Sequence, residues 1–309
     1  MDIVVESLTK QYGSQKAVDQ ISFTVQTGEI LGFLGPNGAG KTTAMKAITG
    51  LFSFNKGEIR IGNKSIKNEA DEIKKHIGYL PEDNELYTEM PVIDYLKFMA
   101  EIQDIPEEKI PERIREVVRL TGLQKEKHKI IGELSKGYQQ RLGLAQALIH
   151  DPEILILDEP TTGLDPNQII EIRELIKKIG KEKTVILSSH ILAEVEATCD
   201  RIVIINNGQI VANGTAGELQ DRAQGKFSMK VAIEGGETND IFNKLKSLDQ
   251  IEMVDFANGE NKLFTVQSVD KNSPAKEIFD MCANNNWYIT QMIPQETKLE
   301  DIFRKLTMN

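Results

Sequence analysis

The chain has 309 residues, 40% hydrophobic and 27% charged, the composition of a globular protein with room for one large or two ordinary domains. Its net charge of -10 argues against bulk binding to nucleic acid, and its two cysteines, Cys199 and Cys282, lack metal-ligand spacing and are expected to be reduced thiols. We expect no signal peptide, and no apolar run approaches the roughly 18 residues that span a bilayer, so any spanning part would come from another chain.

The N-terminal third predicts strands around a phosphate-binding motif. Residues 3–8 alternate as a strand, Tyr12 marks a turn, and residues 17–25 form a second strand. The apolar run Ile30–Leu34 is typical of a buried strand. It is followed by G-x-x-x-x-G-K-T at Gly35–Thr42 and then by apolar residues at helical spacing, the context in which this motif binds phosphate.

The chemistry of this loop follows from its residue types. Glycines allow backbone N–H groups to approach an anion, and the next helix adds the positive end of its dipole. Lys41 supplies a charge for the β- and γ-phosphates, and Thr42 supplies a hydroxyl for Mg²⁺. The candidate ATP-binding residues here are Gly35, Asn37, Gly38, Ala39, Gly40, Lys41, Thr42 and Thr43.

The next segment predicts two short strands, at 57–61 and 77–81, and then an inserted helical subdomain at about 83–150. This subdomain ends in LSKGYQQR, with a helix expected from Gln139. Ser135 and Gly137 just before that helix are at least an N-cap and a turn. A serine and a glycine at a helix N-terminus also form an anion site.

Two carboxylates follow a strand that reads as buried on both faces. The strand is Ile154–Leu157, and Asp158 and Glu159 emerge at its carboxyl end, where open α/β sheets bind ligands. Asp158 suits a Mg²⁺ shell through water, and Glu159 suits a general base that polarises an attacking water. A purely structural acidic pair is the alternative.

The strand Thr184–Ser189 ends at His190, which shares the sheet edge with the two carboxylates. A lone histidine at a strand end is more often a satisfied polar group, but this position favours a γ-phosphate sensor. A loop at 161–166 and a helix at 167–179 precede this strand. A helix at 191–198 and a hairpin at 201–212 follow it.

The remaining residues predict a separate small unit. The order β-α-β-β-α-β over 226–309 suggests a ferredoxin-like α+β domain, and we find no catalytic constellation in it. The predicted domains are therefore 1–222 and 226–309.

About the first 220 positions closely resemble the nucleotide-binding subunit of ATP-binding cassette (ABC) transporters. Gly35–Thr42 resembles the Walker A motif, and Ile154–Asp158 with Glu159 resembles Walker B and the catalytic glutamate. LSKGYQ resembles the LSGGQ signature, with Lys136 and Tyr138 as departures. His190 resembles the switch histidine.

The resemblance implies roles for two further residues. Tyr12 matches the aromatic that stacks on adenine, although its position alone fits a turn residue packed on the sheet. Glu82 takes the place of the Q-loop glutamine, so that it keeps a Mg²⁺-ligating oxygen and adds negative charge. The implied metal residues are then Thr42, Glu82 and Asp158.

The fold implied is a RecA-like P-loop ATPase core of class α/β with an antiparallel β-subdomain. Two copies are expected to pair head to tail, each completing the other's site with Ser135 and Gly137. GYLPE, KGYQQR and LEDIF resemble the subgroup that works with separate membrane permeases, with gliding-motility-associated ATPases as the nearest members.

We therefore expect an ATPase that drives a transporter as a peripheral protein on the cytoplasmic face of the cell membrane. An ABC ATPase acting on nucleic acid or ribosomes is the alternative. The single cassette, the acidic balance and the lack of a coiled-coil arm weigh against it. A non-catalytic nucleotide clamp is opposed by Glu159.

Overall fold

The computed structural model describes residues 1–223, 227–257, 262–270, 272–295 and 299–307. It has two compact units, one of Met1–Ala216 with Phe303–Asn309 and one of Gly217–Ile302. This division differs from the expected one, because the end of the chain belongs to the first unit. A hydrogen bond from the Asn206 side chain to the carbonyl oxygen of Leu306, at 3.0 Å, helps to hold the end of the chain against the first unit.

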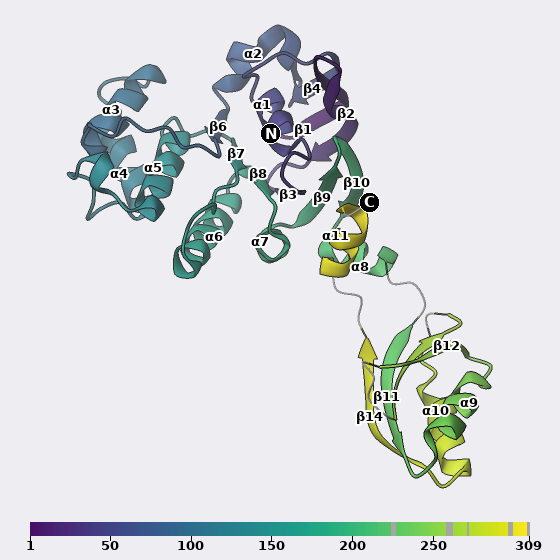
Figure 1. Ribbon diagram of the computed structural model, residues 1–309. Helices are drawn as coiled ribbons and strands as arrows, with labels where there is room; N and C mark the ends of the chain where they lie inside the picture. The colour runs from purple at the N-terminus through teal and green to yellow at the C-terminus, as the bar shows by residue number, and fades with distance from the viewer. Residues whose placement is uncertain (224–226, 258–261, 271, 296–298, 308–309) are drawn as a thin grey trace. The chain divides into compact units, whose positions relative to one another are not determined.

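An antiparallel sheet in the order β2-β1-β4-β5 forms one part of the first unit (Figure 1). Its strands are β1 (Ile3–Tyr12), β2 (Gln15–Val25), β4 (Lys56–Ile61) and β5 (Lys64–Ser65). One buried cluster joins this sheet to the large sheet and to the helices α1 (Lys41–Ile48) and α2 (Ile66–Lys74). The sequence analysis did not predict α2, which buries only Ile66 and Ile73.

The large sheet has the order β10-β9-β3-β8-β7-β6. All neighbours are parallel except the edge pair β9 and β10. The strands are β3 (Ile30–Leu34), β6 (Ile77–Leu80), β7 (Ile154–Asp158), β8 (Thr184–Ser189), β9 (Arg201–Asn206) and β10 (Gln209–Gly214). Every residue of β3, β7 and β8 is buried, as expected for strands of a parallel sheet that is covered on both faces. The carboxyl ends of these three neighbouring strands therefore meet at one edge.

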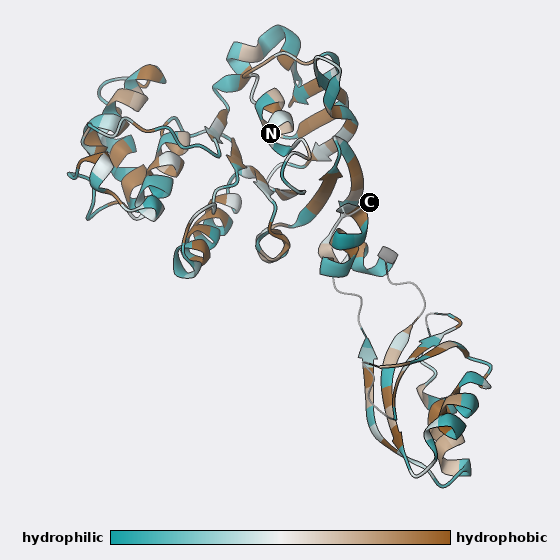
Figure 2. Cartoon of the chain, viewed as in Figure 1, coloured by the Kyte–Doolittle hydropathy of each residue, from teal (hydrophilic) through white to brown (hydrophobic). Residues whose placement is uncertain are grey.

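The helical insertion contains α3 (Val92–Ile102), α4 (Ile110–Thr121), a short 3₁₀ helix (Ile131–Glu133) and α5 (Lys136–Leu148). They share a buried cluster with the large sheet and with α6 (Pro166–Gly180), whose hydrophobic and hydrophilic stripes are visible in Figure 2. Helix α5 begins before the expected Gln139, because Ser135 has the extended backbone of an N-cap. Gly137 lies inside the helix, where a Cβ would come within 2.7 Å of the Gln168 side chain.

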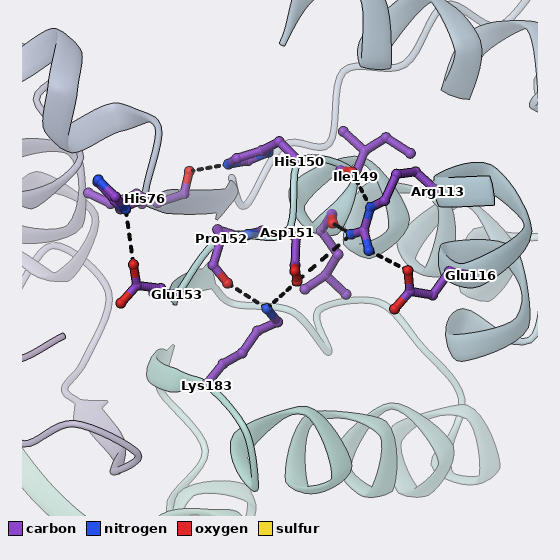
Figure 3. A network of polar contacts seen from close by, with 11 residues as sticks. His76, Arg113, Glu116, Ile149, His150, Asp151, Pro152, Glu153 and Lys183 are labelled. Atoms are coloured by element: carbon purple, nitrogen blue, oxygen red, sulfur yellow. Dashed lines mark hydrogen bonds and ion pairs between the residues drawn. The ribbon is translucent and has the colours of Figure 1, made fainter. Parts of the chain in front are cut away.

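A polar network fixes the end of α5 to its surroundings (Figure 3). Arg113 of α4 donates to two carbonyl oxygens at the end of α5, at 2.9 and 3.0 Å. Lys183, just before β8, donates to the Asp151 carboxylate at 2.7 Å. The His150 Nε2 lies 3.1 Å from the carbonyl oxygen of Ile77 in β6. The helical insertion is thus tied to the large sheet at the chain segment that enters β7.

The second unit is a four-stranded antiparallel sheet in the order β12-β13-β11-β14. Helices α9 and α10 pack on one face of this sheet around a separate buried cluster (Figure 1). Its elements are β11 (Ser228–Glu234), α9 (Thr238–Lys246), β12 (Ile251–Phe256), β13 (Leu263–Ser268), α10 (Ala275–Asn284) and β14 (Tyr288–Gln295).

The other helices of the described residues are α7 (Leu192–Thr198) after β8, α8 (Ala216–Ala223) after β10, and α11 (Leu299–Thr307). Within the described ranges, none of the helices has both the length and the apolar character needed to cross a membrane.

Candidate functional site

The phosphate-binding motif forms the loop between β3 and α1. Gly38 and Gly40 have backbone φ angles of 80° and 107°, a region that residues with a side chain disfavour. A Cβ on Gly40 would also lie 2.3 Å from the carbonyl oxygen of Ala17. Gly40 is the N-cap of α1, and no side chain caps that end. The first amides of α1 are left without a side-chain acceptor, as an anion site requires.

An open pocket of about 510 Å³ lies at this loop. The predicted residues that line it are Asn37, Gly38, Gly40, Lys41, Thr42, Thr43, Glu82 and Glu159. Gly35 and Ala39 are outside the lining. Ala39 is buried, and a Cβ on Gly35 would lie 2.4 Å from the carbonyl oxygen of Ile205, so Gly35 allows the loop to pass close to β9.

Two segments that the sequence analysis did not assign form the rest of the pocket wall. One is residues 15–17 at the start of β2, and the other is the turn at Asn207–Gly208 between β9 and β10. The Gly208 amide donates to the carbonyl oxygen of Ala39 at 3.0 Å, which fixes this turn to the phosphate loop. The Asn-Gly pair predicted a hairpin, but nothing in its sequence indicated which site the hairpin would reach.

Lys41 is a nearly buried cation with three oxygen partners. Its Nζ donates to the carbonyl oxygens of Gly35 and Pro36, at 2.9 and 3.3 Å. It also lies 3.1 Å from the Oε1 of Glu159. Both side chains of this ion pair are only 5–6% exposed, so their attraction is weakly screened by water.

Glu159 is held at the carboxyl end of β7 by contacts on both of its carboxylate oxygens. Besides the ion pair to Lys41, its Oε2 lies 2.9 Å from the Nδ1 of His190, the residue that follows β8. Its backbone φ of 49° is unusual for a residue with a side chain. The Glu159 amide donates to the Ser188 hydroxyl at 3.0 Å, and this bond helps to maintain the strained backbone.

Asp158 is fully buried and has one unsatisfied oxygen. Its Oδ1 accepts a hydrogen bond from the Ser188 hydroxyl at 2.5 Å, whereas its Oδ2 has no hydrogen-bond partner. Burial raises the pKa of Asp158 above its ordinary value, against the lowering effect of the Ser188 hydrogen bond. A neighbouring pocket of about 440 Å³ has Thr42, Glu82 and Asp158 in its lining. Ser188 was not identified from the sequence, where it reads only as part of a buried strand.

Besides Gly35 and Ala39, the predicted residues Tyr12, Ser135, Gly137 and His190 also lie outside the lining of both pockets. Ser135 is exposed and caps α5 without a side-chain hydrogen bond, and Gly137 packs against α6. Tyr12 is 53% exposed, with its ring 6.4 Å from that of Phe52 in an edge-on arrangement. The chain therefore does not bring Ser135 and Gly137 together with its own phosphate loop.

A phosphate loop after one buried strand, with a buried acidic pair after a nearby parallel strand, defines a P-loop nucleotide-binding protein. Comparison with known proteins identifies the family within this class. The family model described as ABC transporter matches residues 18–162. The bacitracin transport ATP-binding protein BcrA of Enterococcus faecalis is 35% identical over 98% of this chain and 96% of its own length. The linearmycin resistance ATP-binding protein LnrL of Bacillus subtilis is 32% identical over 98% and 97%.

Solved structures show the same likeness for the cassette. A structure described as the ATP binding subunit of an ABC transporter has a TM-score of 0.65 and 30% identity, covering 72% of this chain and 93% of that chain. CbiO1 of Clostridium perfringens has the same TM-score and identity, covering 72% and 91%. The chain belongs to the ATP-binding proteins of ABC transporters, and it is an ATPase of that family.

Proposed function

We propose that this chain powers a membrane transporter by hydrolysing ATP with Glu159 as general base. The observation that carries the proposal is the position of Glu159, buried at the end of β7 between Lys41 and His190 and lining the pocket of the phosphate loop. A carboxylate held there can orient a water molecule for in-line attack on a γ-phosphate.

The other residues of the site have distinct proposed roles. The amides of the loop from Gly35 to Thr43 hold the phosphates, and Lys41 neutralises charge that develops on them. His190 orients Glu159 through its Nδ1 and senses the γ-phosphate. Tyr12 provides the aromatic ring for adenine stacking, and its exposure leaves the ring accessible to a base.

The residues present fit a Mg²⁺ ion that accompanies ATP. The buried Asp158 Oδ2 lacks a partner, and Thr42 and Glu82 share its pocket, so that three oxygen-bearing side chains are available. Mg²⁺ keeps several waters and takes few protein ligands, which suits this sparse set. When bound, the ion would neutralise charge on the phosphates. Asp158 would hold its water shell, Thr42 would supply its hydroxyl, and Glu82 would bind directly or through water.

A second copy of the chain is the proposed source of the missing anion site. Ser135 and Gly137 lie at the start of α5, outside the pocket of their own chain. In a head-to-tail dimer they would face the γ-phosphate bound by the partner, and ATP would favour this pairing more than ADP does.

A separate integral membrane permease is the proposed second partner, with the chain on the cytoplasmic face of the cell membrane. CbiO1 is described as part of the ABC transporter complex CbiONQ, which supports this arrangement. The relatives BcrA and LnrL make bacitracin and linearmycin the first cargoes to test. The closeness to gliding-motility-associated ATPases stays a prediction.

The second unit is proposed to be an accessory domain without a catalytic role. Its strand order and β-α-β-β-α-β sequence support a ferredoxin-like fold. None of its described residues lines the nucleotide pocket.

ATP hydrolysis by the full-length chain and its Glu159→Gln variant tests the proposed base. We expect the variant to bind ATP and to lose roughly 10²-fold or more in turnover. Glu153→Gln, a change at a half-exposed carboxylate just before the same strand, is the matched control and should keep its rate. Near-normal turnover in Glu159→Gln would remove Glu159 from this role. Co-purification of ribosomes in place of a permease would favour the nucleic-acid alternative.

A further inference from the structure

A buried carboxylate outside the nucleotide pocket connects the segments that carry Glu159 and His190. Glu194 lies in the first turn of α7 and is 6% exposed. Its Oε2 accepts one hydrogen bond from the Thr161 hydroxyl, at 2.6 Å, and another from the Ser189 hydroxyl, at 3.1 Å. Ser189 directly precedes His190, and Thr161 follows Glu159 by two positions.

Thr161 belongs to the turn after β7, and Ser189 is the last residue of β8. On the β7 side, the Thr162 amide donates to the carbonyl oxygen of Glu159 at 3.1 Å, which closes the turn containing Thr161. On the β8 side, the carbonyl oxygen of Ser189 accepts from the Gly35 amide at 3.3 Å. Glu194 is therefore one hydrogen bond from the turn after Glu159, and one hydrogen bond from Ser189, whose carbonyl oxygen meets the start of the phosphate loop.

Two neutral hydroxyls hold the Glu194 carboxylate at this depth. Burial of an ionised carboxylate is costly unless strong hydrogen bonds compensate it, and hydrogen bonds to a charged acceptor are shorter and stronger than neutral ones. Because one oxygen accepts from both residues, it links the turn after β7 to the end of β8.

We propose that Glu194 is a positioning residue for ATP hydrolysis. By holding Thr161 and Ser189 on one oxygen, it keeps the ends of β7 and β8 at the spacing that allows Glu159 and His190 to meet at 2.9 Å. Glu194 does not line the nucleotide pocket, so it acts through these two residues and not on the nucleotide. The inference rests on the roles proposed above for Glu159 and His190.

Steady-state hydrolysis by the full-length chain separates this role from a structural one. Glu194→Ala should lower kcat by roughly tenfold or more, since small displacements of a catalytic group have large effects on rate. The KM for ATP and the affinity for a fluorescent ATP analogue should stay within about twofold, because the phosphate loop is unchanged. Glu194→Gln keeps an acceptor oxygen and should recover most of the rate.

Thr161→Val is the milder variant should Glu194→Ala fail to fold, and it should lower kcat by a few-fold. Thr121→Val removes another buried threonine hydroxyl, which bonds to a backbone carbonyl in α4, and serves as the matched control with unchanged kcat. In a His190→Ala background, Glu194→Ala should lower kcat little further, because His190, one of the groups that Glu194 positions, is already absent.

Normal kcat in Glu194→Ala would overturn the proposal, as would equal losses in nucleotide affinity and kcat. Full additivity of Glu194→Ala with His190→Ala would also count against it. If Glu159→Gln hydrolysed ATP normally, the proposed function would fail instead, which is a different result from an inert Glu194.

Discussion

Lys41 and Glu159 are paired with each other in the structure, although the proposed mechanism gives each a separate task. In that mechanism Lys41 would meet the phosphates, and Glu159 would accept a proton from water. The ion pair at 3.1 Å keeps both side chains compensated inside a nearly buried site. Phosphate oxygens that attract Lys41 would release the Glu159 Oε1, while the contact to His190 can persist on the other oxygen.

Glu82 offers a residue-scale test of the metal site. It is exposed and lines both pockets, so it can reach a cation between Thr42 and Asp158 without the free-energy penalty of burying its charge. We expect Glu82→Ala to weaken the Mg²⁺ dependence of ATP binding, and Glu82→Gln to weaken it less because an oxygen remains. Titration of Mg²⁺ against ATP affinity measures this.

Glu89→Gln provides the matched control for Glu82, since this exposed carboxylate of the same segment lines neither pocket. It should leave the Mg²⁺ dependence near that of wild type. Identical curves for Glu82→Gln, Glu82→Ala and wild type would mean that Glu82 is not a metal ligand.

At the scale of elements, the buried strands were the most predictable part of the fold. Ile30–Leu34 and Ile154–Leu157 are apolar at every or nearly every position, and Thr184–Ser189 has an apolar centre, because helices or a second sheet cover both faces. Helix α2 was missed because its apolar residues are few, and tertiary packing on the antiparallel sheet supplies its stability.

The candidate site likewise has parts that the sequence predicts and parts that it does not. The phosphate loop and the acidic pair follow from local motifs, since each is a short segment whose spacing fixes its chemistry. Ser188, Glu194 and the turn at Asn207–Gly208 could not be predicted, because their partners are distant in sequence and only the sheet order brings them together. The sequence shows which residues can form hydrogen bonds at the strand ends, but it does not show which residues they bond to.

The network at the end of α5 predicts a pH-dependent stability (Figure 3). Burial lowers the pKa of His150 from its ordinary value of 6.5, and its Nδ1 has no hydrogen-bond partner. The unfolded chain therefore takes up a proton below about pH 6.5 while the folded one resists it, so the free energy of unfolding should fall as the pH drops through this range.

Denaturant unfolding at pH 7.5 and pH 5.5 measures the effect. His150→Gln should show a smaller loss of stability on acidification than wild type. His128→Gln, a change at an exposed imidazole, is the control and should keep the wild-type loss. Equal losses in wild type and His150→Gln would show that this buried imidazole does not contribute.

At the scale of the whole molecule, charge and nucleotide should govern association. Each chain carries a net charge of -10, which opposes pairing, so dimers should be weak and favoured by salt. Light scattering of Glu159→Gln should show dimers with ATP but monomers with ADP. Ser135→Arg, added to this variant, should abolish the dimer and preserve ATP binding by the monomer. A monomer mass with ATP as well as with ADP would contradict this expectation.

Removing the second unit should cost stability but not nucleotide binding. A chain that ends at Gln224 keeps every residue of the pocket lining, so it should bind ATP. It loses the tail that belongs to the first unit, including the bond between Asn206 and Leu306, worth about 1 kcal/mol, and should melt a few degrees lower than the first unit of the full chain.

Asn206→Ala tests the cause of that loss. It should lower the melting temperature of the full chain and have no further effect on the truncated one. Failure of the truncated chain to bind ATP despite a native-like melting transition would contradict the accessory role of the second unit.

The return of the tail to the first unit has a mechanical consequence. A force applied between β1 and the end of α11 acts on two segments of the same unit, and the bond at Asn206 closes the load path within that unit. The residues from Gly217 to Ile302 belong to the second unit and do not carry this force while the tail stays bound. They would bear tension only after the tail has peeled away, so stretching of single molecules should release the tail first and extend the second unit afterwards.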